Sequence, residues 1–377
     1  MENLPIYTCV TRYSDELISE LVTHDTSLIL CFYGSDFNYV ELYEKLKKTG
    51  KHFMGCMDTG RFLNGNYHLD NYTAVGISFP TSIIESVEII SINMDSNDES
   101  IYKDCYKSVK NALHNMKIDP RNPDLEREFA IDFIYGLNSP APILEAQNRV
   151  SLYLPVIGGE SGGKLDFSKS NVMCDKGFGK IGAITVVRLN HNYRYELNMT
   201  SAFARETGKL CVTGIKNSRH ILEFNNKPAL DEYLDIVKIQ KEQLNINTYA
   251  NFTLGLETGY GEKFITSIMK ESDSSLITYN DVKVGTCYGI YRATSQLHAR
   301  SEKLYQLKDK RVIAYLSFDC VLCYAVRDSN SQVEEIGMLY EKELPGIPKI
   351  GFATFGEIIS GTSVNQTETS IAITMIN

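Results

Sequence analysis

The amino-acid sequence predicts an α+β fold of two related α/β halves, in which mixed, largely antiparallel sheets and flanking helices form a layered sandwich. The main observation is one series of elements that occurs near both ends of the chain. It runs from an apolar strand through an amphipathic helix and a short second strand to a segment with the spacing G-x-x-x-x-G. Elsewhere, strands alternate with helices or follow one another at hairpin-like spacings, which favours mixed sheets over a purely parallel fold.

The glycine segments lie at residues 55–60 and 351–356. The elements before them occupy, in the same order, residues 27–33, 39–48 and 52–56 near one end and residues 311–318, 332–342 and 348–352 near the other. Glycine takes positive φ at little cost and lets a backbone or a ligand approach closely, so both segments are expected to form tight turns. Two such turns, if they meet across the halves, would line a pocket.

The other helices follow from capping residues and from apolar spacing. Ser14 can cap a first helix, and Asp15 suits the positive end of its dipole. Apolar residues recur every four positions from Ile101 to Leu113, which predicts a helix over residues 100–117 with one buried face. Further helices are expected from residue 141 onward, with proline in the first turn, and over residues 225–239 and 294–307.

The other strands are expected where β-branched residues alternate or cluster. They occupy residues 71–79, 82–92, 129–135, 182–189, 209–215, 220–224, 275–279 and 287–291. A third strand followed by glycines lies at residues 154–163. We place the boundary between the halves near residue 240, which gives domains at residues 1–240 and 241–377.

Length and composition restrict the class of protein. A chain of 377 residues is expected to hold about two domains, and 43% hydrophobic with 23% charged residues is ordinary for a globular protein. The sequence has no apolar run of roughly 18 residues and no signal-peptide pattern, so we expect a cytoplasmic protein without membrane insertion. The net charge of −9 argues against nucleic acid as a partner.

The nine cysteines are odd in number and scattered, which favours a reducing compartment and free, buried thiols. Cys320 and Cys323 have metal-type spacing, but the chain offers no second pair to complete a site. They lie in an apolar, strand-like run, where residues three apart face opposite sides. We therefore expect no metal site, although Cys320 at a strand end is a candidate pocket thiol.

The glycine segments do not fit a phosphate loop, because Arg61-Phe and Glu357-Ile follow them instead of Lys and Ser or Thr. Each is either a backbone nest for a small anion or a plain tight turn. The glycine-rich residues 158–163 come just after a strand, where open α/β sheets bind ligands. The alternative for these residues is a mobile linker.

Catalytic patterns are weak. The seven histidines are isolated, with no H-E-x-x-H spacing, although they leave room for one axial ligand of a haem. No G-x-S-x-G supports a serine hydrolase, and a Cys–His hydrolase stays open only because its partners would be distant in sequence. Since no acid, base or nucleophile set can be assembled, we expect a protein that is not an enzyme and has no catalytic residues.

Several short motifs of the N-terminal part resemble the FIST family, which pairs FIST-N and FIST-C sensory domains. Gly55-Cys56 resembles the family's G-C-x-T-x-G-E turn, and residues 155–159 resemble its P-x-I-G-G strand and turn. Residues 181–187 are similar to its G-A-V-G-V strand, and residues 225–230 to the G-x-P-A-L helix start that closes FIST-N.

The C-terminal part carries the resemblance further, so that it runs from about residue 25 to the end. Residues 275–277 with 284–286 resemble G-S-L…E-G-T, and Phe318-Asp-Cys320 resembles F-x-C. Residues 351–358 with 364–367 are similar to G-F-x-x-x-G-E-I…N-x-T.

Two single positions and one three-residue segment depart from the family pattern. Its Thr and Glu in the first turn are Asp58 and Arg61 here, and its Gly-Arg-Gly after the F-x-C strand is replaced by residues 322–324. If those family residues contact the ligand, the alternatives are that this chain binds a different ligand or none.

The resemblance implies a signal-input protein that binds a small molecule, with amino acids proposed as ligands. With no output domain fused, the signal would pass to a separate histidine kinase, cyclase or chemoreceptor, as in two-component signalling. Some relatives bind haem and sense nitric oxide, so a haem-based sensor is one alternative, and an adaptor that binds only proteins is another. The expected ligand-binding residues are Gly55, Cys56, Gly60, Arg61, Gly158, Gly159, Cys320, Gly351, Thr354, Gly356 and Glu357.

Overall fold

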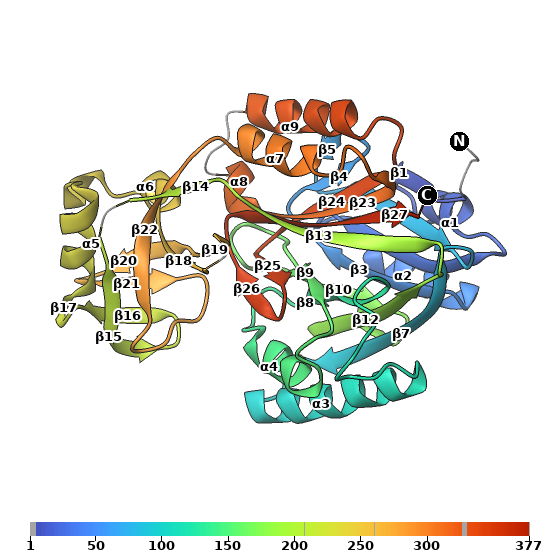
Figure 1. Ribbon diagram of the computed structural model, residues 1–377, viewed down its shortest axis with the longest axis horizontal. Helices are drawn as coiled ribbons and strands as arrows, with labels where there is room; N and C mark the ends of the chain where they lie inside the picture. Colours follow the sequence, from blue (N-terminus) through green and yellow to red (C-terminus); the bar gives the residue numbers. More distant parts are fainter. Residues whose placement is uncertain (1–4, 207, 260, 326–329, 377) are drawn as a thin grey trace.

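The computed structural model describes residues 5–206, 208–259, 261–325 and 330–376 (Figure 1). In these residues the strands form three six-stranded sheets and one nine-stranded sheet. The three smaller sheets make up a body, and the larger sheet belongs to an inserted module, residues 203–293, at the left of Figure 1. The expected class is confirmed, because the sheets are mixed, mostly antiparallel and flanked by helices.

Each body sheet contains the same unit, in which a strand and a helix lead to a parallel second strand, and a later antiparallel strand returns beside the first. In the first sheet the unit is β2 (Thr26–Tyr33), α2 (Tyr39–Thr49), β3 (His52–Met57) and β6 (Ala74–Pro80). In the second sheet it is β8 (Glu128–Ile134), α4 (Ala141–Val150), β9 (Val156–Glu160) and β12 (Ile181–Leu189). In the third sheet it is β23 (Arg311–Cys320), α9 (Asn330–Glu343), β24 (Lys349–Thr354) and β27 (Thr367–Met375). The structure thus adds a third copy to the two that the sequence predicted.

The three sheets exchange strands in a closed ring. After β3 the chain crosses to the third sheet, where β4 (Arg61–Leu63) pairs with β24. After β24 it crosses to the second sheet, where β25 (Gly356–Ile359) pairs with β9. After β9 it crosses to the first sheet, where β10 (Val172–Cys174) pairs with β3. Each crossing strand turns back in a short hairpin, with β5 (Asn66–His68), β26 (Thr362–Val364) and β11 (Gly177–Gly179).

This exchange ties the two ends of the chain together. The third sheet holds β4, β5 and β13 (Tyr193–Ser201) beside β23, β24 and β27, so strands from both sides of residue 240 share one sheet. The domain boundary near residue 240 stays a prediction. Within the body, however, strands from before and after residue 240 are hydrogen-bonded into the same sheets, so no simple interface separates these two parts of the chain.

The centre of the body is aromatic. Phe32, Phe133 and Phe318 occupy the same position in the three first strands, and all three side chains are buried. Their ring centroids lie 5.3 Å apart for Phe32 and Phe133 and 5.8 Å apart for Phe133 and Phe318. Phe352 contacts all three rings. Edge-to-face packing of this kind adds to the stability gained from burial alone.

The remaining body elements cover the sheets. In the first sheet, β1 (Tyr7–Thr11) pairs with β6, and α1 (Ser14–Leu21) lies beside α2. In the second, β7 (Ile84–Asn93) pairs with β12, and α3 (Asp98–Asn115) lies beside α4. Over the third lie α7 (Gln296–Tyr305), α9 and the short α8 (Val321–Ala325) (Figure 1). No helix in the described parts of the chain is both long and apolar enough to span a membrane.

The inserted module has its own apolar core, built around Leu210, Phe224 and Tyr233. Its elements are β14 (Phe203–Arg205), β15 (Leu210–Asn217), β16 (His220–Phe224), β17 (Lys227–Pro228), α5 (Ala229–Val237), the 3-10 helix Lys241–Gln243, α6 (Ile246–Asn251), β18 (Phe252–Glu257), β19 (Lys263–Thr266), β20 (Ile268–Ser272), β21 (Ser275–Thr278) and β22 (Cys287–Ala293). The chain enters and leaves the module side by side, where the Thr294 amide donates to the Ala202 carbonyl at 2.8 Å.

Two expectations about cysteines need correction. The run after Cys320 is helical, because α8 begins at Val321, so Cys320 and Cys323 do not lie on opposite faces of a strand. Seven cysteines are free and buried as expected, but Cys211 and Cys287 form a disulfide. They are 76 residues apart in sequence and are brought together by the pairing of β15 with β22, so their spacing carried no sign of the bond.

Candidate functional site

The three second strands end in the same glycine spacing, at residues 55–60, 158–163 and 351–356. In each, the first glycine lies opposite a residue of the parallel first strand. A Cβ atom there would lie 2.4 Å from the Cys31 carbonyl oxygen at Gly55, 1.9 Å from that of Asp132 at Gly158 and 2.1 Å from that of Ser317 at Gly351. The strands approach too closely for any side chain, so glycine at these positions is required by packing.

The three turns meet at one place in the body. A Cβ atom at Gly162 would lie 3.0 Å from the Ala353 carbonyl oxygen and 3.1 Å from the Thr59 amide nitrogen. The Ala353 amide donates to the Gly60 carbonyl at 2.7 Å. The predicted meeting of the glycine turns is therefore observed, and the turn at residues 158–163 takes part in it.

Most of the expected ligand-binding residues lie near this junction. Gly159 pairs with Glu357 and Gly158 with Ile358 across β9 and β25. Gly351 pairs with Phe62 across β24 and β4. Gly55 and Cys56 lie inside β3, where Cys56 belongs to the apolar core. Their role as ligand contacts stays a prediction.

Arg61 and Asp58 form a buried ion pair at the first turn, with 2.9 Å between Arg61 Nε and Asp58 Oδ1. Arg61 also donates to the backbone carbonyls of Asp70 and Thr73 at 2.8 and 2.7 Å. Burial raises the pKa of Asp58, and the Arg61 charge opposes this only in part. The side chain of Arg61 is therefore used to stabilise the first glycine turn.

Thr354 and Glu357 form a second buried polar group. Glu357 Oε2 accepts from the amide and hydroxyl of Thr367 at 3.1 and 2.9 Å, and the Thr354 hydroxyl lies within hydrogen-bond distance of both Glu357 and the Asp319 carbonyl. Burial raises the pKa of the Glu357 carboxyl well above its usual range. Cys320 is also fully buried, and burial raises the pKa of its thiol in the same way, so it is not a reactive thiolate.

A small hollow at the junction is lined by Gly60, Arg61 and Gly351, together with Tyr67 and Asp319. Its volume is about 10 Å³. That is room for a single water molecule. The junction as it stands is a closed structural core and offers no space for a metabolite.

Sequence reasoning missed a buried network centred on Arg300 of α7. Its guanidinium lies 2.5 Å from Asp319 Oδ1, 3.0 Å from Glu368 Oε2 and 2.6 Å from the Tyr340 hydroxyl. Tyr315 also donates to Glu368 at 2.8 Å. The polar run at residues 367–370, inside an otherwise apolar strand, is the signal in the sequence that could have revealed it.

A larger cleft lies between the body and the inserted module, with a volume of about 270 Å³. The body contributes the start of α4 and the β25–β26 hairpin, and the module contributes the loop after β21. The lining residues are Pro140, Ala141, Leu144, Glu145, Asn280, Asp281, Lys283, Gly361, Thr362 and Ser363. Small-molecule sites commonly start near 300 Å³, so this cleft suits a ligand of amino-acid size.

Asp281 supplies a negative charge to this cleft. It accepts from Ser139 at 2.5 Å, from Ser218 at 2.9 Å and from Arg219 Nε at 3.0 Å. Burial by itself would raise the pKa of Asp281, but the hydrogen bond from Ser139 and the charge of Arg219 outweigh it, so the pKa lies below its ordinary value. The carboxylate is therefore ionised at neutral pH and attracts a cationic group.

Asn280, beside it, has an unused acceptor. Its Nδ2 donates to Ser363 Oγ at 3.1 Å, while its Oδ1 is buried and finds no donor among the residues that the structure describes. Ser363 in turn donates to Glu160 at 2.6 Å, and Glu160 lies against Gly356. The cleft is thus connected by hydrogen bonds to the second and third glycine turns, although it is lined by none of the expected ligand-binding residues.

The haem alternative requires a histidine on an enclosed, apolar crevice. His298 lines a shallow groove between α7 and α9, but its side chain is 76% exposed and 3.5 Å from Glu302. His52 and His220 contact Asp175 and Ser275. These surroundings do not fit a haem, and the described residues contain no group of three or more His, Cys, Asp or Glu that could hold a metal ion.

Comparison with known families gives two matches in chain order. The FIST N domain matches residues 27–227, and the FIST C domain matches residues 229–360. Their border falls inside the inserted module, between β17 and α5. No curated protein matches the chain.

Proposed function

The chain belongs to the FIST family of sensory signal-transduction domains, as its motifs indicated, and from this premise we propose that it binds a small zwitterionic metabolite of the amino-acid class. The ligand would occupy the cleft between α4 and the inserted module. FIST domains act as sensors, and catalytic activity is not known for them. The proposed role is that of a signal-input protein.

The observation that carries this proposal is the ionised Asp281 in the lining of the cleft, beside Asn280, whose buried Oδ1 has no donor among the residues that the structure describes. A buried acceptor without a donor costs free energy on the order of 1–3 kcal/mol, and a ligand N–H group removes that cost. An ammonium group satisfies both side chains at once, because it donates up to three hydrogen bonds and carries a positive charge.

The rim of the cleft suits the other end of a zwitterion. Lys283 is exposed there, with its Nζ 3.9 Å from Glu145. A ligand carboxylate near Lys283 would replace this weak surface pair with a closer contact. Pairing of both ends selects a zwitterion over a plain amine or a plain acid, because each of those can make only one of the two charged contacts.

The position of the cleft supports a role in signalling. Ser139, α4 and the β25–β26 hairpin belong to the body, whereas Asn280, Asp281 and Lys283 belong to the module. A ligand bound to both sides favours the arrangement in which they are close, and shifts the equilibrium by its differential affinity for that arrangement. We propose that a separate histidine kinase, cyclase or chemoreceptor recognises the change.

Isothermal titration calorimetry of the whole chain against the standard amino acids tests the proposal. We expect at least one to bind, and Asp281→Asn to weaken that binding by about tenfold or more, since it removes the charge that pairs with the ammonium group. Asp231→Asn, on the exposed face of α5, is the matched control and should bind as the wild type does.

Lys283→Met separates a binding defect from a folding defect, because Lys283 is 85% exposed and its loss leaves the fold intact. Lys283→Met should weaken binding of the amino acid and leave binding of the decarboxylated amine unchanged. No heat with any amino acid, or equal binding by wild type and Asp281→Asn, would exclude this ligand class in the cleft and favour another small metabolite or the protein-binding adaptor.

A further inference from the structure

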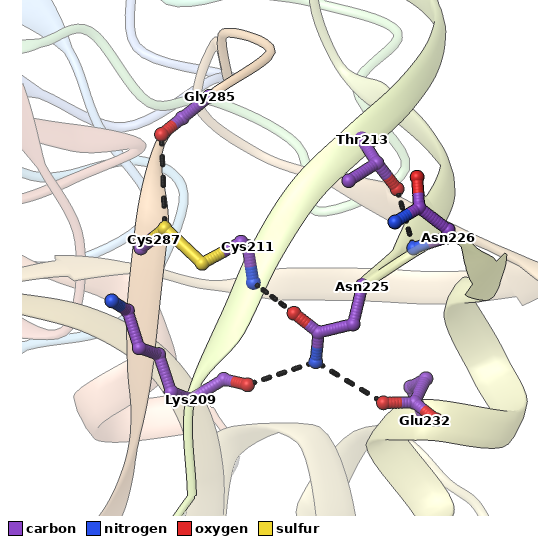
Figure 2. The surroundings of a disulfide bond; sticks show 8 residues. All are labelled: Lys209, Cys211, Thr213, Asn225, Asn226, Glu232, Gly285 and Cys287. Atoms are coloured by element: carbon purple, nitrogen blue, oxygen red, sulfur yellow. Dashed lines mark hydrogen bonds between the residues drawn. A yellow bond between two sulfur atoms is a disulfide. The ribbon is translucent and has the colours of Figure 1, made fainter.

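The disulfide of the inserted module lies in a different environment from the other cysteines. Cys211 in β15 and Cys287 in β22 are register partners on neighbouring antiparallel strands, with Cα atoms 3.9 Å apart (Figure 2). Both residues are partly exposed, whereas the seven free cysteines are buried. Access is one of the factors that decides whether an outside thiol reaches a sulfur atom. This pair is open to such a reaction and the core thiols are not.

The bond sits where two parts of the nine-stranded sheet meet. On one side β15 pairs with β16, and on the other β22 pairs with β18. β15 and β22 themselves form two register pairs, Leu210 with Tyr288 and Cys211 with Cys287, along with two backbone hydrogen bonds at Val212 of 2.8 and 2.9 Å. β14, which precedes β15 in the chain, pairs with the same edge of β22 at three further positions. The disulfide is thus the covalent link across a short join.

On the β15 side, the contacts around the bond hold Cys211 in place when the bond opens. Asn225 Oδ1 accepts from the Cys211 amide at 3.1 Å, and Asn225 Nδ2 donates to the Lys209 carbonyl and to Glu232 at 3.0 and 3.1 Å (Figure 2). These contacts hold the start of β15 independently of the sulfur atoms. Lys209 lies just before β15, two residues from Cys211, and a positive charge near a cysteine favours its thiolate.

We propose that Cys211 and Cys287 form a reversible thiol–disulfide exchange site whose reactants are low-molecular-weight thiols and disulfides, and whose opening loosens the join between β15 and β22. A thiolate attacks one cysteine sulfur and forms a mixed disulfide, while the other cysteine leaves as a thiolate and takes up a proton. A second thiol then attacks the mixed disulfide and frees the first cysteine. In total, two thiols are oxidised to one small disulfide, and the protein disulfide is reduced to two thiols.

Differential alkylation of the folded, full-length protein tests the site. The protein is incubated with or without reduced glutathione and labelled with iodoacetamide. It is then unfolded, reduced and labelled with N-ethylmaleimide, and its peptides are weighed by mass spectrometry. Glutathione should raise the first label at Cys211 and Cys287 at least about tenfold, leave the buried cysteines unlabelled, and be reversed by oxidised glutathione. Equal labelling without glutathione, or none with it, would overturn the proposal.

Hydrogen exchange measures the loosening. Amides at residues 210–212 and 286–288 should exchange faster after reduction, and Cys211→Ser with Cys287→Ser should show the fast exchange without any thiol. Cys9→Ser, which changes a buried cysteine of the body, should keep the wild-type response. Unchanged exchange in reduced wild-type protein would refute the loosening even if the double variant failed to fold. The pair lines no part of the ligand cleft, so neither test depends on the proposed function.

Discussion

The body and the inserted module place their polar residues in opposite ways. In the body, ionisable side chains such as Arg61, Arg300 and Glu357 are fully buried and bonded to other protein groups. At the module, Asp281, Asn280 and Lys283 line a cleft open to a ligand, and the disulfide is partly exposed. Buried charges cost too much to be left unpaired, so the body network is structural, and the groups that remain available to other molecules lie at the module.

The largest expected effect follows from breaking the buried network of the body. Arg300→Met leaves Asp319 and Glu368 buried without their cation, and removing one partner of a buried ion pair typically costs about 3–5 kcal/mol. The matched change in the module, Arg292→Met, removes an exposed pair with Glu206 and should cost at most about 1 kcal/mol. Urea denaturation of both variants measures the difference. Similar losses would mean that burial does not separate the two regions.

The next effect concerns the glycine turns. Gly351→Ala places a Cβ atom 2.1 Å from the Ser317 carbonyl oxygen, and backbone on both sides has no room to move. Overpacking of this kind costs roughly 1–3 kcal/mol or more. A Cβ atom added at Gly259 in the module would have no other atom within 4 Å. The free energy of unfolding of Gly259→Ala should therefore be within about 0.5 kcal/mol of the wild-type value. A stable Gly351→Ala protein would show that the parallel strands can separate and that packing does not fix this glycine.

These two regions also explain what the sequence could predict. The repeated strand, helix and glycine turn are local patterns, so two copies of the unit and the turns that join them were predicted from residue spacing. The elements of the third copy were also expected, at residues 129–135, from residue 141 and at residues 154–163, but their pattern was not identified as a further copy of the unit. The strand exchange between sheets is a long-range contact and leaves no local signal.

The cleft and the disulfide were missed for a similar reason. Asp281 and Ser139 are far apart in the chain, and each is an ordinary polar residue in its own segment. The ligand site was predicted at the glycine turns because a repeated glycine spacing is easy to recognise in a sequence. In the structure these glycines are required by close packing of the strands, and the open cleft lies at the edge of the module.

The smallest expected effect is a contrast in pH dependence between the regions. Asp132 of the body is fully buried with one hydrogen bond, from Gln147 at 3.2 Å, and burial raises its pKa to about 8. The folded state therefore keeps a proton that the unfolded chain loses near pH 4. The stability linked to this group is fully present below about pH 4 and declines as the pH rises towards 8, by up to about 1.4 kcal/mol per pH unit.

The pH dependence of stability that is linked to Asp281 has the opposite sign, because folding lowers the pKa of this carboxyl. Its contribution is present above the unfolded pKa and is lost as the pH falls through the folded value. Between pH 6 and 7, the free energy of unfolding of the wild type should fall relative to Asp132→Asn, while its difference from Asp281→Asn should stay constant. Urea titrations of the three proteins at both pH values provide the measurement. If Asp132→Asn kept the wild-type slope, the buried carboxyl would already be ionised, and the body would hold an unpaired charge that its packing must then stabilise by means other than protonation.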